Sequence, residues 1–529
     1  MLVKDWREKV WGDINGQWDL LIIGGGITGA GIFRMAARAG LKTLLVEAND
    51  YAFGTSSRSS KLVHGGLRYL KNGQYNVTFE SVRERERLLK EAPDLVTSLE
   101  FIFPVYEKYH TPAWQIGLSL GIYDLFGLKK AHGRLSAKDL ENKASTLNNT
   151  GLAFSYYYYD ALVDDARLVL RNIQEGIALG GTSLTYAKVQ KLLFDNHGQV
   201  CGAVIIENAF NEESFSKEVS AKVVVNATGP WTDDLRTHVS EQKIIRKLRG
   251  SHIQFTHKRF PVNCGFSIIH PVDKRSLFVL PWEGVTVVGT TDLDHPSELE
   301  QQRPEPFMTK EEGEYLLVAA NHSFPQYALT SKDIISSFSG LRPVLRSDET
   351  DPSKASRAHS LLGEKGLITI TGGKLTSYRK MAYDVMQKVQ VQLNRKINLN
   401  KKEKILYTLG DGINEAYSEE AFHRWRGRFG NELPLFLESI RAEENNLIPS
   451  TTAYWSEIRW AVRNEGVVHL DDLLLRRVRL GLVLPDGGLQ YAEKIKIITQ
   501  EELNWNQTQW AQELQRYKTI WKNCYYLSD

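Results

Sequence analysis

The feature that most constrains this chain is the pattern of residues 19–47, which predicts a strand, a glycine turn, a helix and a second strand. Residues 20–23 are a short apolar run typical of a central parallel strand, and Gly24, Gly26 and Gly29 follow it in G-x-G-x-x-G spacing. The first glycine allows the turn, the second lets backbone approach a pyrophosphate, and the third lets the helix pack on the strand. We therefore expect a dinucleotide whose phosphates lie at the positive end of a helix.

The end of the second predicted strand narrows the choice of dinucleotide. Glu47 closes this strand near the spacing of roughly 20 residues at which an acidic group meets a ribose hydroxyl. A carboxylate there would repel a 2′-phosphate, so FAD or NAD is favoured over NADP. The competing interpretation is a glycine-rich turn in an ordinary α/β unit.

Two later segments are expected to bring further glycine turns to the same sheet edge. A buried strand over residues 223–225 ends in the small turn Ala227-Thr228-Gly229, and a strand over 367–371 ends in Gly372-Gly373. We expect Gly373, Lys374 and Leu375 to open a helix and to present its positive end to a ligand. Together with the Gly- and Ser-rich loop after Glu47, these turns favour a whole flavin held permanently over a nicotinamide that must come and go.

Composition and charge bound the function classes. At 529 residues the chain should hold two or three domains, and Lys+Arg 66 against Asp+Glu 63 gives no basic excess for nucleic acid. Cys201, Cys264 and Cys524 form no metal or disulfide spacing, so we expect no metal and a reducing cytoplasm. The first 16 residues lack the apolar core of a secretory signal.

Residues 114–128 are the longest apolar stretch and are too short to span a bilayer, which takes about 20 apolar residues. Lys129, Lys130, His132 and Arg134 follow this stretch, so the helix could lie on an anionic membrane surface. We favour the other interpretation, a buried helix with a solvated basic end.

Five separated motifs carry a resemblance to a known family. They are SSRSSKLVHGGLRYL at 56–70, NATGPW at 226–231, GSHI at 250–253, GLRPV at 340–344 and TGGKLTSYRKMA at 371–382. In this order they resemble the respiratory, FAD-dependent glycerol-3-phosphate dehydrogenases of the D-amino-acid-oxidase and glycine-oxidase superfamily. The resemblance implies oxidation of sn-glycerol 3-phosphate to dihydroxyacetone phosphate, with hydride passing to non-covalent FAD and electrons then passing to a membrane quinone.

The implied fold class is α/β, a Rossmann-like FAD-binding domain with an inserted antiparallel-sheet substrate domain and an all-helical C-terminal domain. Several strands over 250–292 and the helical pattern after about residue 395 agree with it. We expect the FAD-binding domain to be formed by residues 1–80, 186–240 and 336–395. We expect a helical and linking region, partly facing substrate or membrane, at 81–185. An antiparallel-sheet substrate domain is expected at 241–335 and a helical C-terminal domain at 396–529.

The motifs and the resemblance together assign the FAD contacts to residues in the glycine turns and the loops around them. The assigned residues are Gly24, Gly26, Gly29, Glu47, Thr55, Ser56, Ser57, Ser60, His64, Gly65, Gly66, Val189, Ala227, Thr228, Gly229, Gly340, Gly373 and Leu375.

The substrate needs a second set of residues. A phosphate dianion suits arginine forks and lysines, and the candidates are Arg68, Arg342, Arg357 and Lys374. A base is needed for the C2 hydroxyl, and His252 is preferred. The competing histidines are less suited: His64 is expected to contact the flavin and His270 to be structural. Tyr69 could donate a hydrogen bond to substrate or pack under the flavin.

Several alternatives remain open at this point. A glycerophosphate oxidase would pass electrons to oxygen and release peroxide, although such oxidases tend to carry an extra segment that we do not find here. An amino-acid oxidase of the same superfamily would need a carboxylate clamp and no phosphate site, and a flavin-binding scaffold would turn nothing over. We expect peripheral contact with the cytoplasmic face of the membrane, and we leave the oligomeric state open, with a homodimer as one arrangement.

Overall fold

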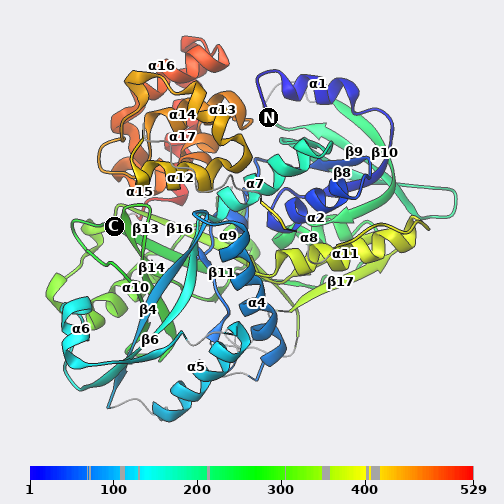
Figure 1. Cartoon of the computed structure of the whole chain (residues 1–529). Coiled ribbons are helices and arrows are strands. Elements are labelled where there is room, and N and C mark those ends of the chain that lie inside the picture. The colour runs from blue at the N-terminus through cyan, green and yellow to red at the C-terminus, as the bar shows by residue number, and fades with distance from the viewer. Residues whose placement is uncertain are drawn as a thin grey trace.

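The computed structural model describes residues 1–67, 70, 73–107, 113–128, 131–210, 215–303, 305–347, 358–400, 404–406 and 417–527. Figure 1 shows two sheet-based layers beside a cluster of helices formed by the last part of the chain. The predicted α/β class, with a separate antiparallel sheet and a helical C-terminal region, is confirmed.

The first sheet carries the predicted glycine turns. Its strand order is β17-β18-β10-β1-β2-β7, and the four pairings from β18 to β7 are parallel. The strands are β1 (Gln17–Ile23), β2 (Thr43–Val46), β7 (Thr182–Leu184), β10 (Ser216–Asn226), β17 (His359–Glu364) and β18 (Leu367–Gly372). Because β1, β10 and β18 run in the same direction, the turns after them meet at one edge of the sheet, as the sequence predicts.

Three helices pack together against this sheet. They are α2 (Ile27–Arg38), α7 (Asp165–Ala178) and α11 (Tyr378–Gln392). Nearly all of α2 is buried, because it lies between the strands and the two other helices. A hairpin of β8 (Ala187–Phe194) and β9 (Val200–Glu207) extends the sheet through β10.

The second sheet is mainly antiparallel and forms the layer expected for substrate. Its order is β15-β11-β14-β13-β12-β4-β6-β3, with β16 paired to β11 and β5 to β6. The strands are β3 (Leu62–Val63), β4 (Val96–Tyr106), β5 (Gly133–Leu135), β6 (Leu152–Val163), β11 (Ile245–Thr256), β12 (Gly265–Ile269), β13 (Ser276–Trp282), β14 (Val285–Gly289), β15 (Leu293–Asp294) and β16 (Ser336–Leu345).

The region 81–185 differs from the expected helical and linking character. It contains α4 (Tyr75–Glu91), α5 (Ala113–Gly127) and α6 (Ala137–Ala144), but also β4 and β6, which are central strands of the second sheet. The parallel pairing of β4 with β12 joins residues that are far apart in sequence. Such long-range pairing leaves no local signal, so the substrate layer could not be recognised as two separate segments.

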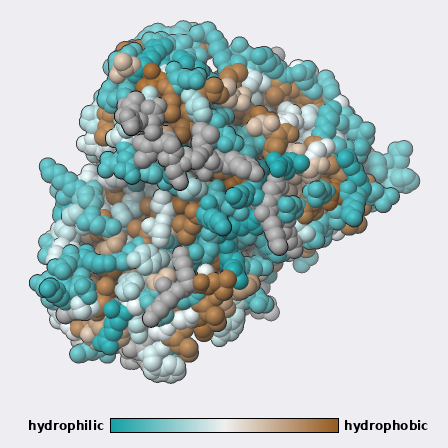
Figure 2. Space-filling model, in the orientation of Figure 1, coloured by the Kyte–Doolittle hydropathy of each residue, from teal (hydrophilic) through white to brown (hydrophobic). Residues whose placement is uncertain are grey.

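The expectation that residues 114–128 form a buried helix is wrong. In α5 the side chains of Ile116, Leu120 and Tyr123 are buried, but Trp114 and Leu125 are 66% and 68% exposed. The helix therefore covers the body with one face only. A nearly continuous apolar run has no periodicity from which the covered face could be read. Figure 2 shows hydrophobic residues gathered at the lower edge of the molecule, over α4 and α5.

The last part of the chain is a helical bundle that packs on the second sheet. Its helices are α12 (Glu419–Phe429), α13 (Leu433–Ser439), α14 (Trp455–Asn464), α15 (Leu480–Val483), α16 (Ala492–Leu503) and α17 (Gln507–Cys524). Trp510 and Trp521 of α17 are buried in a core that also includes Trp282 and Phe338 of the sheet. These two tryptophans therefore join α17 to the second sheet.

Candidate active site

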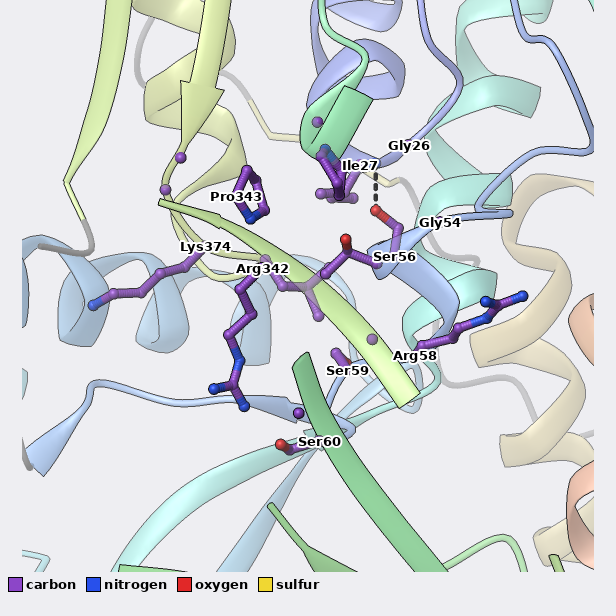
Figure 3. Close-up of a pocket in the computed structure, with 18 of the residues that line it drawn as sticks. Gly26, Ile27, Gly54, Ser56, Arg58, Ser59, Ser60, Arg342, Pro343 and Lys374 are labelled. Carbon is purple, nitrogen blue, oxygen red and sulfur yellow. Dashed lines mark hydrogen bonds between the residues drawn. The ribbon is translucent and has the colours of Figure 1, made fainter. Parts of the chain in front are cut away.

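A cavity of about 1650 Å³ lies where the carboxyl edge of the parallel sheet meets the antiparallel sheet. It is lined by the turns after β1, β10 and β18, by the loop between β2 and β3, and by residues of β11 and β16. Figure 3 shows the loop through Ser56 and Ser60 and the strand carrying Arg342 on either side of this space. Segments from most of the chain therefore converge on one site.

The glycine turn after β1 is built as the motif predicts. Gly24 has φ +113°, and a Cβ there would lie 2.6 Å from the Ala227 carbonyl oxygen. A Cβ on Gly29 would lie 1.8 Å from the Gly24 carbonyl oxygen, so only glycine allows α2 to approach the turn. Gly26 is the N-cap of α2 and offers no side-chain cap, which leaves the positive helix end directed at the cavity.

Glu47 lines the cavity beside this turn. Its carboxylate accepts hydrogen bonds from the backbone N–H groups of Gly25 at 2.6 Å and Asn49 at 2.9 Å. Burial raises the pKa of the Glu47 carboxyl, against the lowering effect of these two hydrogen bonds. The group is thus held in place at the end of β2, where a ribose hydroxyl would meet it.

The loop between β2 and β3 is fixed to its neighbours by hydroxyl groups. Ser56 Oγ accepts from the Ile27 N–H at 2.9 Å, and Thr55 donates to the Leu341 carbonyl oxygen. Ser60 Oγ lies 2.8 Å from Nε2 of His252. The loop thereby connects the glycine turn to the second sheet.

The turn after β18 departs from the prediction in one respect. Gly372 and Gly373 both have φ +74°, but α11 begins at Tyr378, so Lys374 does not open the helix. Lys374 lies in the connecting turn, and its Nζ donates to Ser81 Oγ of α4 at 3.1 Å. Two left-handed glycines redirect the chain, and the helix forms only after a further turn.

His252 lies on β11, almost completely buried at 2% exposure. Its ring stacks on Phe338 of β16 with centroids 4.6 Å apart, and a Cβ on the opposite residue Gly289 would lie 2.1 Å from the ring. Burial, followed by the charges of Arg342 and Lys61, holds the pKa of His252 well below its usual value. The imidazole is therefore neutral at pH 7 and able to accept a proton.

Arg342 lies on β16 and reaches into the cavity toward Ser60 (Figure 3). Its Nη1 donates to Asp292 at 2.8 Å, and its Nη2 donates to Thr290 Oγ1 at 3.2 Å. Arg275 also pairs with Asp292, at 3.3 Å. Two guanidinium groups are thus held at the same side of the cavity by one buried carboxylate.

The structure places most of the predicted site residues around this cavity. Those that line it are Gly24, Gly26, Glu47, Thr55, Ser56, Ser60, His64, Gly66, Val189, Ala227, Thr228, Gly229, His252, Gly340, Arg342, Gly373, Lys374 and Leu375. Gly29, Ser57 and Gly65 are not among the lining residues: Gly29 serves packing, the Ser57 carbonyl accepts from Lys61, and the Gly65 N–H donates to Tyr123. Arg68, Tyr69 and Arg357 lie outside the described residues.

Sequence reasoning missed several residues around His252. Phe338 stacks on His252, Lys61 lies over the Phe338 ring, and Asp165 pairs with Lys61. Arg275 and Asp292 line the cavity, and Asp292 pairs with Arg342. A lysine in a run of serines and glycines has the appearance of a solvated side chain, so nothing in the local sequence indicates that Lys61 is buried. The Asp-Lys-Arg run at 273–275 was the one available signal for Arg275.

Comparison with known protein families gives the class. Residues 19–379 match the family model described as FAD dependent oxidoreductase, and residues 368–510 match that of the C-terminal domain of alpha-glycerophosphate oxidase. The first match covers both sheets and every glycine turn described above. The fold and the cavity are thus those of an FAD-dependent oxidoreductase.

Comparison with individual proteins identifies the family within this class. The aerobic glycerol-3-phosphate dehydrogenase of Staphylococcus aureus (strain USA300) is 33% identical over 494 residues, which cover 88% of this chain and 87% of that protein. The glycerol-3-phosphate dehydrogenase from Bacillus halodurans, solved in complex with FAD, has a TM-score of 0.79 at 29% identity and covers 99% of this chain and 98% of its own. The chain belongs to the FAD-dependent glycerol-3-phosphate dehydrogenase family.

The fold is shared more widely. The L-alpha-glycerophosphate oxidase from Mycoplasma pneumoniae has a TM-score of 0.58 at 17% identity, covering 75% of this chain and 99% of that one. At this level of identity the match shows a shared fold over three quarters of the chain.

The cofactor is FAD, and the cavity fits it. The N-terminus of α2 suits the pyrophosphate, because Gly26 at the N-cap has no side chain and the end of the helix lines the cavity. Glu47 suits the ribose of the adenosine half. The turn at 373–375 lines the same cavity as His252 and Arg342.

Proposed function

We propose that this protein oxidises sn-glycerol 3-phosphate to dihydroxyacetone phosphate and passes the electrons to a membrane quinone. The observation that carries the proposal is a neutral, buried histidine and an arginine in the same cavity as the FAD-binding turns. The names of the similar proteins from Staphylococcus aureus and Bacillus halodurans support the same substrate.

Each group has a definite task in this proposal. Bound FAD supplies the acceptor for the hydride that leaves C2. Arg342 binds the phosphate through its fork of N–H donors, and Lys374 adds a second positive charge from the turn after β18. His252 takes the proton of the C2 hydroxyl at Nε2 when that hydroxyl replaces Ser60 Oγ, 2.8 Å away, as the partner of this nitrogen. Backbone N–H groups at 373–375 line the cavity and would offer hydrogen-bond donors to an anionic part of the bound cofactor.

An anaerobic flavin-reduction assay tests the substrate. Glycerol 3-phosphate should bleach the yellow enzyme, whereas glycerol and amino acids should not. Arg342→Ala should raise KM about ten- to hundredfold with FAD content unchanged, because a hydrogen-bonded charge pair contributes about 1.5–3 kcal/mol. Arg346→Ala is the matched control, since Arg346 is exposed and donates to the Ile245 carbonyl oxygen outside the cavity. An enzyme that holds FAD but is not bleached by glycerol 3-phosphate would contradict the substrate assignment.

The position of helix α5 supports the proposal of a lipid-soluble electron acceptor and of a peripheral membrane-binding site. Gln115, Ile116 and Ser119 line the cavity, whereas Trp114 and Leu118 on the outer side are 66% and 57% exposed. No helix within the described ranges has the length and hydropathy to cross a bilayer. A single helix thus separates the cavity from an apolar outer surface.

Neighbouring residues of α4 extend this outer surface. Phe79 packs edge-on against Phe126 of α5 at 5.3 Å and is 43% exposed. The exposed Arg83 lies over the Phe79 ring at 5.4 Å, which adds positive charge beside the apolar residues. Aromatic and basic side chains in this combination favour an anionic lipid surface.

Vesicle flotation tests the membrane site. Leu118→Asp should weaken binding to phosphatidylglycerol vesicles about tenfold or more, because burying a leucine contributes about 1.5–3 kcal/mol and a carboxylate is repelled by the lipid. Ile497→Asp is the control, since Ile497 on α16 is 56% exposed and belongs to the C-terminal bundle. Equal binding of both variants and the unmodified protein would refute the surface on α5.

A glycerophosphate oxidase is the second candidate, because residues 368–510 match the C-terminal domain model of alpha-glycerophosphate oxidase. The two activities differ only in the electron acceptor. Comparing peroxide release with quinone or dye reduction in the same preparation separates them: stoichiometric peroxide and no quinone reduction would favour the oxidase.

A further inference from the structure

Lys61, in the loop between β2 and β3, places a fully buried ammonium group against Phe338, the ring that stacks on His252. The Lys61 side chain is 0% exposed, and its Nζ lies 4.5 Å from the centre of the Phe338 ring. Phe338 in turn stacks on His252 with an angle of 11° between the rings. One aromatic ring therefore contacts both the lysine and the histidine.

Lys61 is fixed by hydrogen bonds to two parts of the chain. Its Nζ donates to the Ser57 carbonyl oxygen at 2.6 Å and to both carboxylate oxygens of Asp165, at 3.0 and 2.9 Å. Asp165 is the first residue of α7, and it also orients the loop by accepting from Ser59 Oγ at 2.7 Å. Lys61 therefore has a single position relative to the loop that carries Ser60.

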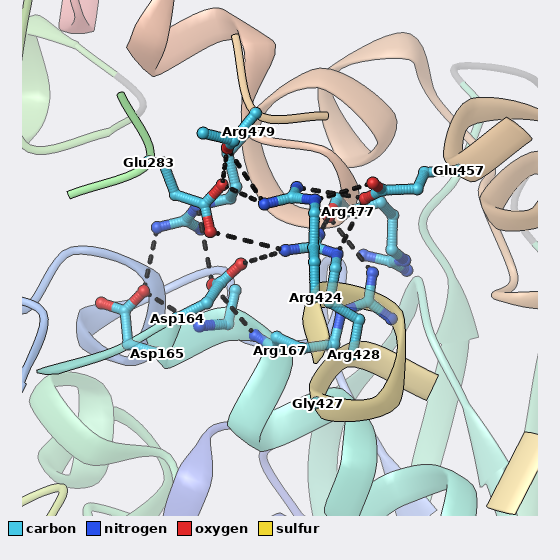
Figure 4. A network of polar contacts seen from close by, with 12 residues as sticks. Asp164, Asp165, Arg167, Glu283, Arg424, Gly427, Arg428, Glu457, Arg477 and Arg479 are labelled. Atoms are coloured by element: carbon cyan, nitrogen blue, oxygen red, sulfur yellow. Dashed lines mark hydrogen bonds and ion pairs between the residues drawn. The ribbon is translucent and has the colours of Figure 1, made fainter. Parts of the chain in front are cut away.

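The C-terminal bundle completes this arrangement. Arg479 donates from Nη2 to Asp165 at 2.9 Å and to the Ser57 carbonyl oxygen at 2.9 Å. Figure 4 shows Arg479 and Asp165 within a larger network that includes Asp164 and Arg428. Lys61 and Arg479 share the carboxylate of Asp165, while Asp164 pairs with Arg428 at 3.1 Å and lies 3.8 Å from Nε of Arg479.

Positive charge outweighs negative charge around His252. Arg342 on β16 and Lys61 on the loop both act on the imidazole, and the carboxylates of Asp292 and Asp165 are bound to those two cations. The remaining neighbours are the neutral Ser60 hydroxyl and the Phe338 ring. A second proton on His252 would therefore be placed between two cations in a buried site.

We propose that Lys61, held by Asp165 and by Arg479 of the C-terminal bundle, is a positioning residue that keeps His252 in the neutral form able to accept a proton. The assignment rests on the proposed role of His252 as the base. It also gives the C-terminal bundle a part in the reaction, since Arg479 fixes the carboxylate that fixes Lys61.

Lys61 is charged in the pH range in which a histidine would gain a proton. Burial, with the charge of Arg479, lowers the pKa of Lys61 to about 7, against the raising effect of Asp165. Below pH 7 the ammonium is thus charged, and this is the range in which a histidine would otherwise gain a proton. At higher pH the lysine can lose its charge without consequence, because the histidine is then neutral in any case.

Histidine-ring NMR on the holoenzyme tests the proposal, with the His252 signal assigned by its absence in His252→Gln. In Lys61→Met the proton affinity of His252 should rise about tenfold, the effect of removing one nearby like charge. Arg171→Met is the matched control, because Arg171 is a buried cation that donates to the Gly427 carbonyl oxygen, away from His252. An unchanged His252 titration in Lys61→Met, or an equal change in Arg171→Met, would overturn the proposal.

The unmodified enzyme gives a second measurement that does not depend on a variant folding. The His252 signal should show a small inflection over the pH range in which Lys61 loses its proton, while the ring itself stays neutral. Absence of this inflection would also overturn the proposal. The acid limb of the pH profile of kcat/KM for glycerol 3-phosphate should move to higher pH in Lys61→Met. If the enzyme does not oxidise glycerol 3-phosphate at all, the proposed function is wrong. The NMR titration still decides the role of Lys61 in that case.

Discussion

At the scale of single residues, the FAD site depends on atoms that are missing. Gly29 lies in α2 where a Cβ would lie 1.8 Å from the Gly24 carbonyl oxygen, and backbone cannot move aside as a flexible side chain can. Gly29→Ala should therefore push α2 away from β1 and reduce bound FAD, with a cost of about 1–3 kcal/mol from overpacking. The measurement is flavin content after gel filtration. Gly121→Ala is the control, because Gly121 is also helical but has no atom within 4 Å of an added Cβ, so this variant should keep its flavin.

At the scale of elements, the features with local signals could be predicted and those created by long-range packing could not. The strands ending at Ile23, Asn226 and Gly372 were predictable because apolar runs precede glycine turns. The pairing of β4 with β12, the exposed face of α5 and the start of α11 at Tyr378 depend on neighbours distant in sequence. Among site residues, those in motifs line the cavity, whereas Lys61 and Asp165 form a pair 104 residues apart that no spacing rule describes.

At the scale of the whole molecule, buried charges join the C-terminal bundle to the FAD-binding sheet. Arg477 binds both carboxylate oxygens of Asp50, just after β2, at 2.7 Å. His469 makes a similar connection: its Nδ1 lies 2.8 Å from Glu513 of α17, and its Nε2 lies 2.9 Å from the carbonyl oxygen of Ala209, after β9. Both partners of the ring are acceptors, so both nitrogens donate and the imidazole is charged.

This connection should make stability depend on pH. Burial alone would lower the pKa of His469, but the hydrogen bond to Glu513 and the charges of Asp472 and Glu513 raise it overall, despite Arg516. A group whose pKa is raised on folding stabilises fully below its unfolded value of about 6.5, and the effect is lost as pH rises through the folded value. The melting temperature should thus fall between pH 6 and pH 9, and it should fall less in His469→Gln. His197→Gln, in the exposed turn of the β8–β9 hairpin, should behave like the unmodified protein. Parallel pH dependences of melting in His469→Gln and the unmodified protein would exclude a charged His469 from the contact between the bundle and the sheet.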